Sequence, residues 1–564
     1  MKIKKIITSI LFVLTILVLT SCSLIKEDKN ITVEEKNVKF TNYSDEYDIK
    51  ATSMKAYFID SGVTPYVEGQ NFMETLDGFS DMSNITFTKS GLFSEFRINL
   101  RLQNIVTVST IFNWDKNTIR FTDLYATQIN KSTSQTDFMK HMKVTSETVE
   151  GGGSVTLELE KYGFDILYNE GRVLIPFSIM NFIYCSQNYY NIYYNGSEFA
   201  GDYLAIGTKS SEYQTVYKTE LRGQQPSQEL RNETYNFMSF VMHYYYGLND
   251  MNPNVESDLK SLEAEIRSTD PKVFMGGEAK FINQKLNELH SGLITLSYYM
   301  NPSDYISADY QSESATNTRA AASDLASAKA KNYGADKFPV VRFSSNTAII
   351  FFDEFSTAPT SEIYNEDGSV KDKAYEKDTY ELFRYAFTEI KKHSEIQNVV
   401  IDLSQNGGGN LAALLKALGF LTNDEVFYTS YNLLNGRKSF MGVKSDVLDN
   451  GKYGEDAYTG YKYFIQTSLL TYSSANIMSG ISKNYKYATI IGQKSGGGMC
   501  SILPVVFPDG TTVQISSTNQ SRIKVKTDSG YDLVPIEKGV EVDIHIDYKD
   551  YYNDAKLVQI ISQA

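Results

Sequence analysis

Two turns in the second half of the chain carry the residue types that acyl transfer needs. Ser473 and Ser474 stand between an apolar run and a segment with helical spacing, and Gly407, Gly408 and Gly409 stand at a similar junction earlier. A serine hydroxyl can act as a nucleophile, and N–H groups of a glycine turn and of a helix start can hold an oxyanion. Two alternatives stay open: the serine only caps the helix, and the glycines only form a flexible turn.

The elements around these turns predict that they meet. Residues 399–403 read as a β-branched strand, and leucines recur at helical spacing over 411–418. In the later piece, 464–470 read as a strand, 477–485 as a helix and 488–491 as another strand. If both strands belong to one parallel sheet, the two turns lie at its carboxyl edge, where open α/β folds bind their ligands.

The segments before the first turn continue the same order. Strands are predicted at 340–343 and 347–352, and an amphipathic helix at 375–393. From Glu229 the apolar period is helical, including the stretch AKFINQKLNELHSGLITLSYY, and 320–331 is an alanine-rich helix. Strand, helix, strand, glycine turn and helix is the order of an α/β domain.

Four short motifs follow one another in the second half of the chain: IDLSQNGGG, TYSSAN, IIGQKSGGG and PIEKGVEVD. In this order they resemble DLRxNGGG, TxSxAE, VxGxxTxGG and ExxGVxPD of serine peptidase family S41, which includes the carboxy-terminal processing proteases and the tricorn core proteases. The resemblance covers roughly 228–564. It implies an α/β peptidase core of the ClpP/crotonase-like kind behind a helical lead-in, with Ser473 as nucleophile and Ser474 as the second choice.

A serine nucleophile needs a base, and the chain has 5 histidines. His290 lies on a turn before Ser291 and Gly292, where its side chain can leave a helix surface; by spacing alone, a lone histidine on a turn is more often structural. LNELHSGL resembles the family's LxDxHTxx segment, with Glu288 in place of the aspartate. This resemblance implies that His290 is the general base, as in the tricorn-like branch. The other histidines are His141, His243, His393 and His545.

The resemblance also implies a glutamate that supports the base. Glu537 in PIEKGV matches that position with one residue fewer before the glycine, and Asp532 and Glu541 are the fallbacks. The processing-protease branch uses a lysine instead, but that position is Gly498 here, and Lys494 stands four residues earlier. A Ser-His(-Glu) mechanism is therefore favoured over a Ser-Lys dyad.

Two further departures from the family's pattern concern anchoring. Ser404 stands where DLRxN has arginine, and Asn476 where TxSxAE has glutamate. The implied reaction is proton transfer from Ser473 to His290, attack on a peptide carbonyl, and an oxyanion held by the N–H groups of Gly408 and Ser474. No metal or organic cofactor is implied. Between His290 and residue 346 there are too few residues for a PDZ domain.

Composition restricts the partners. The chain has 564 residues and a net charge of −14, which argues against nucleic acid as a partner. Lys2, Lys4 and Lys5 precede an apolar run that ends in Leu-Thr-Ser-Cys at Cys22. This pattern looks like a bacterial lipoprotein signal with a lipid-modified Cys22, and an ordinary secretion signal is the alternative. The expected location is the outer face of a bacterial cell membrane.

We predict five segments in a multidomain α+β chain. A signal peptide at 1–21 is followed by a tether at 22–39 and a β-rich domain at 40–223, in which the stretches from Lys55 and from Phe164 form a weak repeat. A helical lead-in at 224–345 and an α/β core at 346–564 complete the chain. The remaining cysteines, Cys185 and Cys500, are predicted to be buried thiols.

The predicted function is a serine endopeptidase outside the cytoplasmic membrane, acting on peptides or unfolded proteins. The alternative is a catalytically inactive surface lipoprotein that keeps the S41 fold and binds peptides or glycans. Nucleotide binding at the triple glycine is disfavoured, because no Lys-Ser/Thr pair follows Gly409 and the GxGxxG spacing fails at Ala412.

Overall fold

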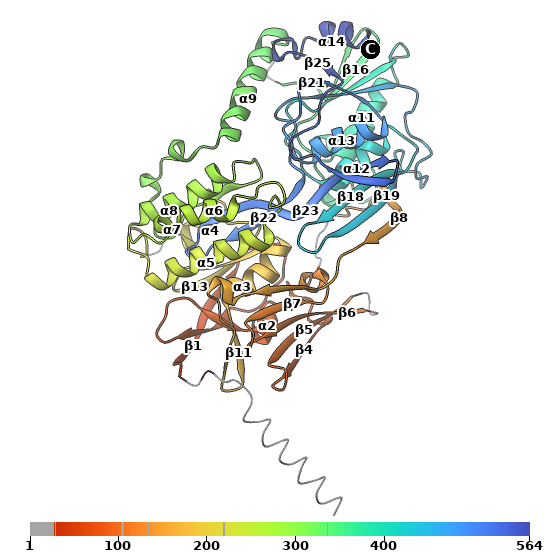
Figure 1. Ribbon diagram of the computed structural model, residues 1–564. Helices are drawn as coiled ribbons and strands as arrows, with labels where there is room; N and C mark the ends of the chain where they lie inside the picture. The colour runs from red at the N-terminus through yellow and green to blue at the C-terminus, as the bar shows by residue number, and fades with distance from the viewer. Residues whose placement is uncertain are drawn as a thin grey trace, which may run out of the picture.

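The computed structural model describes residues 28, 30–102, 106–131, 136–217, 220–334 and 337–563. The predicted signal peptide and Cys22 lie outside the described residues. Two β-sheets from the first part of the chain form one end of the molecule, helices occupy its middle, and the α/β region forms the other end (Figure 1). In the part of the chain that the structure describes, no helix is both long and apolar enough to cross a membrane.

The first N-terminal sheet has seven strands in the order β10-β11-β3-β2-β1-β13-β12. Strand β1 begins at Val33 and pairs with β2 and β13, so the end of the predicted tether, 33–39, belongs to this sheet and is not a linker. The strands are β1 (Val33–Asn42), β2 (Ser53–Ile59), β3 (Tyr66–Glu68), β10 (Leu167–Asn169), β11 (Arg172–Pro176), β12 (Tyr190–Tyr194) and β13 (Glu198–Tyr203).

The two stretches of the weak repeat adopt the same local structure in this sheet. From Lys55, β2, a turn and β3 lead into helix α2 (Gly69–Thr75); from Phe164, β10, a turn and β11 lead into helix α3 (Phe177–Met180). Strands β3 and β11 pair antiparallel, with Val67 opposite Ile175. The two copies therefore meet through their second strands.

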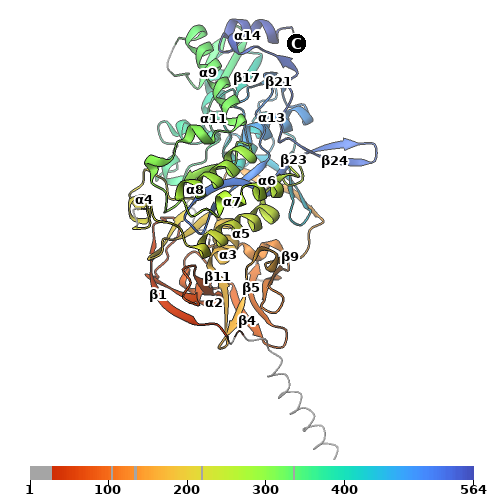
Figure 2. The ribbon, with the colours of Figure 1, turned by 60° about the vertical axis from the view of Figure 1, so that its left-hand side comes forward.

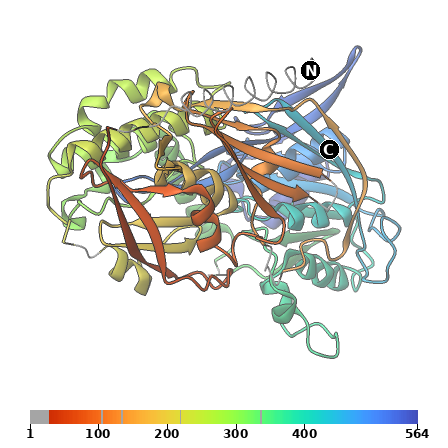
Figure 3. The same cartoon turned by 90° about the horizontal axis from the view of Figure 1, so that it is seen from below.

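A second sheet of five antiparallel strands, β4-β5-β6-β7-β9, lies next to the first (Figures 1 and 3). In β5 the side chains alternate between buried and partly exposed, which is the period of a strand with one covered face. The buried face carries Phe96, Ile98 and Leu100. The strands are β4 (Ile85–Ser90), β5 (Glu95–Leu102), β6 (Val106–Asn113), β7 (Thr118–Phe121) and β9 (Val155–Glu158).

The helical lead-in packs against these sheets. Helix α5 begins after the capping Ser227, whose hydroxyl accepts the Leu230 N–H, and its Phe237 ring meets Phe182 edge to face. The helices are α4 (Ser211–Val216), α5 (Gln228–Tyr245), α6 (Val255–Ser261), α7 (Glu263–Ile266), α8 (Pro271–Ala279) and α9 (Glu313–Asn332).

The prediction that the helical period runs on through residue 299 was wrong. After α8 a π-helical segment, Lys280–Lys285, ends the helix, and Gly292–Thr295 forms strand β14. Strand β14 pairs with β23 (Thr512–Thr527). A tertiary partner far along the chain therefore overrides the local period.

The α/β region is built on a six-stranded sheet in the order β15-β16-β17-β20-β21-β25. All neighbouring pairs are parallel except β15 and β16. The strands are β15 (Val341–Ser344), β16 (Thr347–Phe351), β17 (Asn398–Asp402), β20 (Lys462–Thr467), β21 (Thr489–Gly492) and β25 (Ile544–His545). The helices are α10 (Thr360–Ile363), α11 (Thr379–Ile390), α12 (Leu411–Gly419), α13 (Ser474–Tyr485) and α14 (Asp554–Ile561).

An antiparallel sheet joins this region to the first part of the chain. Its path is β14-β23-β18-β19-β8, and β22 and β24 also pair with β23. Strand β8, from the segment predicted as the N-terminal domain, pairs with β19, and the β23–β24 hairpin projects from the molecule (Figure 2). The strands not yet given are β8 (Met142–Glu150), β18 (Val426–Asn432), β19 (Arg437–Ser445), β22 (Cys500–Val506) and β24 (Gly530–Pro535).

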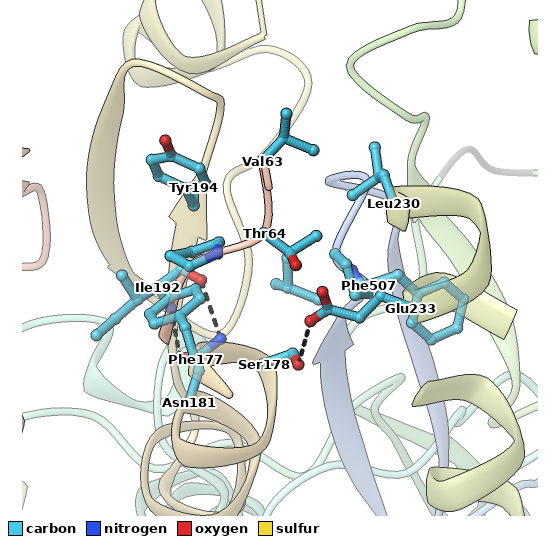
Figure 4. Close-up of a pocket in the computed structure, with 13 residues that line it drawn as sticks. Val63, Thr64, Phe177, Ser178, Asn181, Ile192, Tyr194, Leu230, Glu233 and Phe507 are labelled. Carbon is cyan, nitrogen blue, oxygen red and sulfur yellow. Dashed lines mark hydrogen bonds between the residues drawn. The ribbon is translucent and has the colours of Figure 1, made fainter. Parts of the chain in front are cut away.

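Two glutamates of α5 fasten the first sheet to the lead-in. The Glu229 carboxylate accepts the N–H groups of Val63 (2.8 Å) and Thr64 (3.1 Å). One turn later, Glu233 accepts the Ser178 hydroxyl at 2.6 Å inside a narrow apolar pocket (Figure 4). Burial raises the pKa of Glu233 to about 7, so this interface contains a carboxyl group that titrates near neutral pH.

Candidate active site

Ser473 occupies a strained position between strand β20 and helix α13. Its backbone angles are φ 53° and ψ −123°, which side-chain-bearing residues rarely adopt. Its N–H donates to the Gly497 carbonyl at 2.9 Å, which holds the turn. Although it stands at the N-cap position, its side chain makes no capping hydrogen bond. Backbone strain of this kind is typical of functional turns.

Ser474 has a structural contact instead. Its side chain is buried, and its hydroxyl donates to the Gly409 carbonyl at 2.6 Å. Ser473 is only partly buried. Of the two serines, Ser473 therefore has the more accessible hydroxyl, while Ser474 ties the helix start to the glycine turn.

The glycine turn after β17 touches the serine turn, as the sequence predicted. At Gly408, where φ is +113°, a Cβ atom would lie 2.6 Å from the Ser473 Cβ. Only glycine permits this approach, because it has no side chain and tolerates positive φ. The helix α13 adds its positive end and the N–H of Ser474, which has no acceptor within the helix.

The predicted oxyanion donor Gly408 is engaged in this conformation. Its N–H donates to the Asn406 Oδ1 atom at 2.9 Å. For an oxyanion to be held here, that hydrogen bond must be exchanged or the N–H of Gly409 must take its place. The two turns therefore lie close together, but the N–H of Gly408 is bonded to Asn406 within its own turn.

His290 lies beside the serine turn. Its imidazole meets the Tyr472 ring edge to face, with ring centroids 4.7 Å apart, and Tyr472 directly precedes Ser473. His290 is 6% exposed, and burial lowers its pKa to about 4. Its Nδ1 atom is buried and has no hydrogen-bond partner within the described ranges. The ring is therefore neutral at pH 7, which a general base requires.

Glu537 lies nearby but is not bonded to the imidazole Nδ1 atom. Its carboxylate accepts the Met499 N–H at 2.8 Å. Burial and the neighbouring Glu288 raise the pKa of Glu537 to about 8. The fallback residues lie elsewhere: Asp532 is exposed on β24, and Glu541 pairs with Lys494 at 2.6 Å.

Glu288 is a residue whose role the sequence did not reveal. Its carboxylate accepts hydrogen bonds from the backbone N–H of His290 at 2.5 Å and from the Ser291 hydroxyl. Burial raises the pKa of Glu288. It lines a pocket of about 880 Å³ together with Tyr472 and Glu537. In the sequence, the one indication of this role was that Glu288 stands two residues before His290.

The departures from the family's motifs have physical explanations. A Cβ atom at Gly498 would lie 2.6 Å from the Tyr472 ring, so a lysine there is sterically excluded. Asn476, in place of the glutamate, donates to the Ile536 carbonyl at 3.0 Å and accepts the Ser495 hydroxyl at 2.7 Å. It thereby holds together the two loops that carry the last two motifs.

The guanidinium of Arg342 contacts the DLSQN motif, in which Ser404 stands where the family's pattern has arginine. Arg342 on β15 lies 3.6 Å from Asp402 and 3.0 Å from Asp554. Ser404, in the arginine's place, contacts the Tyr552 hydroxyl at 3.0 Å. An arginine from another strand thus faces the buried aspartate at the end of β17.

Cysteines and metal ligands contribute little to the site. Cys185 and Cys500 are free and buried, as predicted. Among the described residues, no group of three or more histidine, cysteine, aspartate or glutamate side chains is arranged to hold a metal ion.

Comparison with known proteins supports the family. Residues 366–546 match the model of peptidase family S41, so this region of the chain is similar to that family. The match includes Ser473, the glycine turn and Glu537, whereas His290 lies before it. A search of curated proteins found no match to the chain.

Several solved structures match parts of this chain at low identity. Mature CPAF complexed with lactacystin matches 60% of this chain and 100% of its own, with 12% identity and a TM-score of 0.40. A lipoprotein from Streptococcus agalactiae matches 60% and 98%, with 13% identity and a TM-score of 0.33. The photosystem II D1 C-terminal processing protease matches 40% and 52%, with 18% identity and a TM-score of 0.27. The chain thus spans about half of that protease, and these likenesses concern the fold alone.

Proposed function

We propose that this protein is a serine endopeptidase in which Ser473 is the nucleophile and His290 the general base. The observation that carries the proposal is the convergence on one turn: the Gly408 turn packs against Ser473, and the imidazole of His290 packs against Tyr472. These elements come from three separate parts of the chain. Their meeting supplies a nucleophile, a neutral base and backbone donors in one place.

The reaction follows the usual order of acyl transfer. His290 takes the hydroxyl proton of Ser473, the oxygen attacks the peptide carbonyl, and His290 returns the proton to the leaving amine. Water, deprotonated by the same histidine, then releases the acyl group. The N–H of Ser474 and one from the glycine turn hold the oxyanion. No step requires a metal or organic cofactor.

An extended peptide fits the surface beside this site. Strand β14 begins two residues after His290 and is the terminal strand of its sheet, so one of its edges has no neighbouring strand along that path. A groove of about 1410 Å³ runs along it. A substrate peptide can add as a further strand there, which favours unfolded proteins or flexible segments as substrates.

The proposal also includes the location. The lipobox-like sequence before Cys22 supports a lipid anchor that holds the enzyme on the outer face of the cell membrane. Metabolic labelling with radioactive palmitate, in a bacterial host, is expected to label the wild-type chain and not Cys22→Ser. Absence of label in both would leave a secreted enzyme without an anchor, and equal label in both would place the lipid on a residue other than Cys22.

The principal experiment compares casein cleavage by the wild type, Ser473→Ala and Ser474→Ala, followed by mass spectrometry. Cleavage by the wild type that Ser473→Ala alone abolishes supports the mechanism. A serine-directed fluorophosphonate is expected to label Ser473 in the same proteins. Cleavage that survives Ser473→Ala would contradict it.

A non-catalytic binding protein remains the second candidate, because three groups are not in their catalytic arrangement. The Gly408 N–H is bonded to Asn406, the His290 Nδ1 atom has no partner within the described part of the chain, and the raised pKa of Glu537 favours its protonated form. Absence of both cleavage and phosphonate labelling, with peptide binding retained, would select this candidate.

A further inference from the structure

A polar pocket of about 290 Å³ lies between the two halves of the molecule, formed by different residues from those of the candidate active site. One wall comes from the 3₁₀ turns Leu124–Thr127 and Ser186–Asn188 of the first part of the chain, and the other from β18, β19 and β23. Its volume is close to the lower end of the range of ordinary small-ligand sites.

Neutral hydrogen-bonding side chains dominate the lining. Amides and hydroxyls supply both donors and acceptors, and two tyrosines, Tyr125 and Tyr245, add aromatic surface. The principal polar side chains are Gln128, Gln187, Asn432, Ser439, Thr518 and Asn519. A ligand with many groups that both donate and accept hydrogen bonds is the natural complement of such a wall.

Charge argues against an ionic ligand. No carboxylate is among the described residues that line the pocket, so a cation would find no partner there. Arg437 is the one charged lining residue, and its guanidinium lies 3.5 Å from Asp123 and 4.4 Å from the centre of the Tyr125 ring. This charge is already compensated, which disfavours phosphate or carboxylate ligands.

The strand pairing argues against a peptide read through its main chain. Strand β18 lies between β19 and β23, with Asn432 opposite both Arg437 and Asn519. The far side of β19 is covered by β8. No strand edge is therefore open at this wall, and recognition has to come from side chains.

One amide shows that the wall has unused hydrogen-bonding capacity. Asn432 is not that amide: it donates to the Asn519 Oδ1 atom at 2.8 Å, which fixes the orientation of Asn519, and its own Oδ1 atom accepts the N–H groups of the turn that follows it. The Nε2 atom of Gln187 is buried and has no hydrogen-bond partner in the described residues. A buried donor without an acceptor is costly, and a bound hydroxyl would satisfy it.

We propose that this pocket binds a neutral oligosaccharide. Its hydroxyls would exchange hydrogen bonds with the amides of Gln187 and Asn519, and a sugar face would stack on Tyr125. This site is separate from the proposed peptidase activity and does not depend on it. Because the pocket joins the two halves, a bound sugar would attach both halves to a glycan-bearing surface.

Calorimetric titration of the full chain in detergent tests this proposal. The probes are maltotetraose, cellotetraose and chitotetraose as neutral sugars, tetragalacturonic acid as an anionic sugar, and an acetylated, amidated tetra-alanine peptide. We expect at least one neutral sugar to bind and the other two classes not to bind. Binding of no neutral sugar, or preferential binding of the peptide or the anionic sugar, would overturn the proposal.

Substitutions of lining residues test whether the sugar binds in this pocket. Gln187→Leu and Asn519→Leu are expected to weaken the affinity for the sugar at least tenfold. Tyr125→Ala, at a position 37% exposed and so compatible with folding, is expected to do the same. Gln559→Leu on α14 is the matched control, and Ser473→Ala should bind the sugar as the wild type does. Unchanged affinity in Tyr125→Ala and in the folded amide variants would refute this location.

Discussion

The ring of Tyr472 lies against the imidazole of His290, with their centroids 4.7 Å apart, although 182 positions separate them in the chain (472 − 290). This contact brings the candidate base to the residue that precedes the candidate nucleophile. Tyr472 is itself confined by Gly498 on its other side. The tyrosine therefore links three of the motifs that define the site.

The two adjacent serines should differ sharply on substitution. Ser473→Ala is expected to lower kcat/KM on casein-derived peptides by a factor of about 10⁴ or more, because it removes the nucleophile. Ser474→Ala removes a buried hydrogen bond to Gly409 and should cost about 1 kcal/mol of stability with less effect on kcat/KM. Steady-state kinetics and thermal unfolding measure the two effects. The reverse order of activity losses would name Ser474 as the nucleophile.

Gly498→Ala tests the confinement of Tyr472. The added methyl group would meet the tyrosine ring at 2.6 Å, so we expect a loss of about 2–4 kcal/mol in the free energy of unfolding and a large loss of activity. Gly368→Ala is the matched control, because its φ of +81° equals the +82° of Gly498 while its Cβ would meet nothing within 4 Å. It should lose only about 1 kcal/mol. Similar losses in both variants would show that the ring contact is unimportant.

The pKa of Glu537 predicts how activity depends on pH. The carboxyl is held protonated below about pH 8 by burial and by Glu288, so support of the imidazolium of His290 becomes available only above that value. We expect kcat/KM to rise with pH through about 8 in the wild type. In Glu537→Gln this rise should be absent and the rate lower. A rise of equal size in the variant would exclude Glu537 as its source.

The pKa of Glu233 predicts how stability depends on pH. Its value of about 7 in the folded protein exceeds the 4.5 of the free side chain, so the folded state binds the proton more tightly. The stabilisation is complete at low pH and is lost as the pH rises towards 7. Urea unfolding between pH 5 and 8 should show a smaller loss of stability in Glu233→Gln than in the wild type. The exposed Glu147→Gln serves as control and should follow the wild type.

The pH dependence of His290 has the opposite sign. Its pKa of about 4 lies below the ordinary value of 6.5, so its contribution to stability is present above pH 6.5 and lost as the pH falls towards 4. His290→Gln is expected to unfold less steeply with acid than the wild type. His141 has a similarly lowered pKa and gives a comparison outside the site. An acid slope unchanged in His290→Gln would contradict the burial of the ring.

Much of the site's local structure could be predicted from sequence. The strands and helices around Ser473 and Gly408 were predictable because β-branched runs, helical leucine spacing and glycine turns are local signals. Strand β14 was not predictable, because its residues continue a helical apolar period and become a strand only by pairing with β23. The same holds for the pairing of β8 with β19.

The sequence by itself determined the class of chemistry: a serine turn, a glycine turn and a histidine in motifs that resemble one peptidase family. The tertiary structure alone decided which groups are free to act. It placed the Ser474 hydroxyl on Gly409, the Gly408 N–H on Asn406 and Glu288 beside His290. The reason is physical: residue types and spacing follow from the chain itself, whereas hydrogen-bond partners, burial and the resulting pKa values depend on segments that only folding brings together.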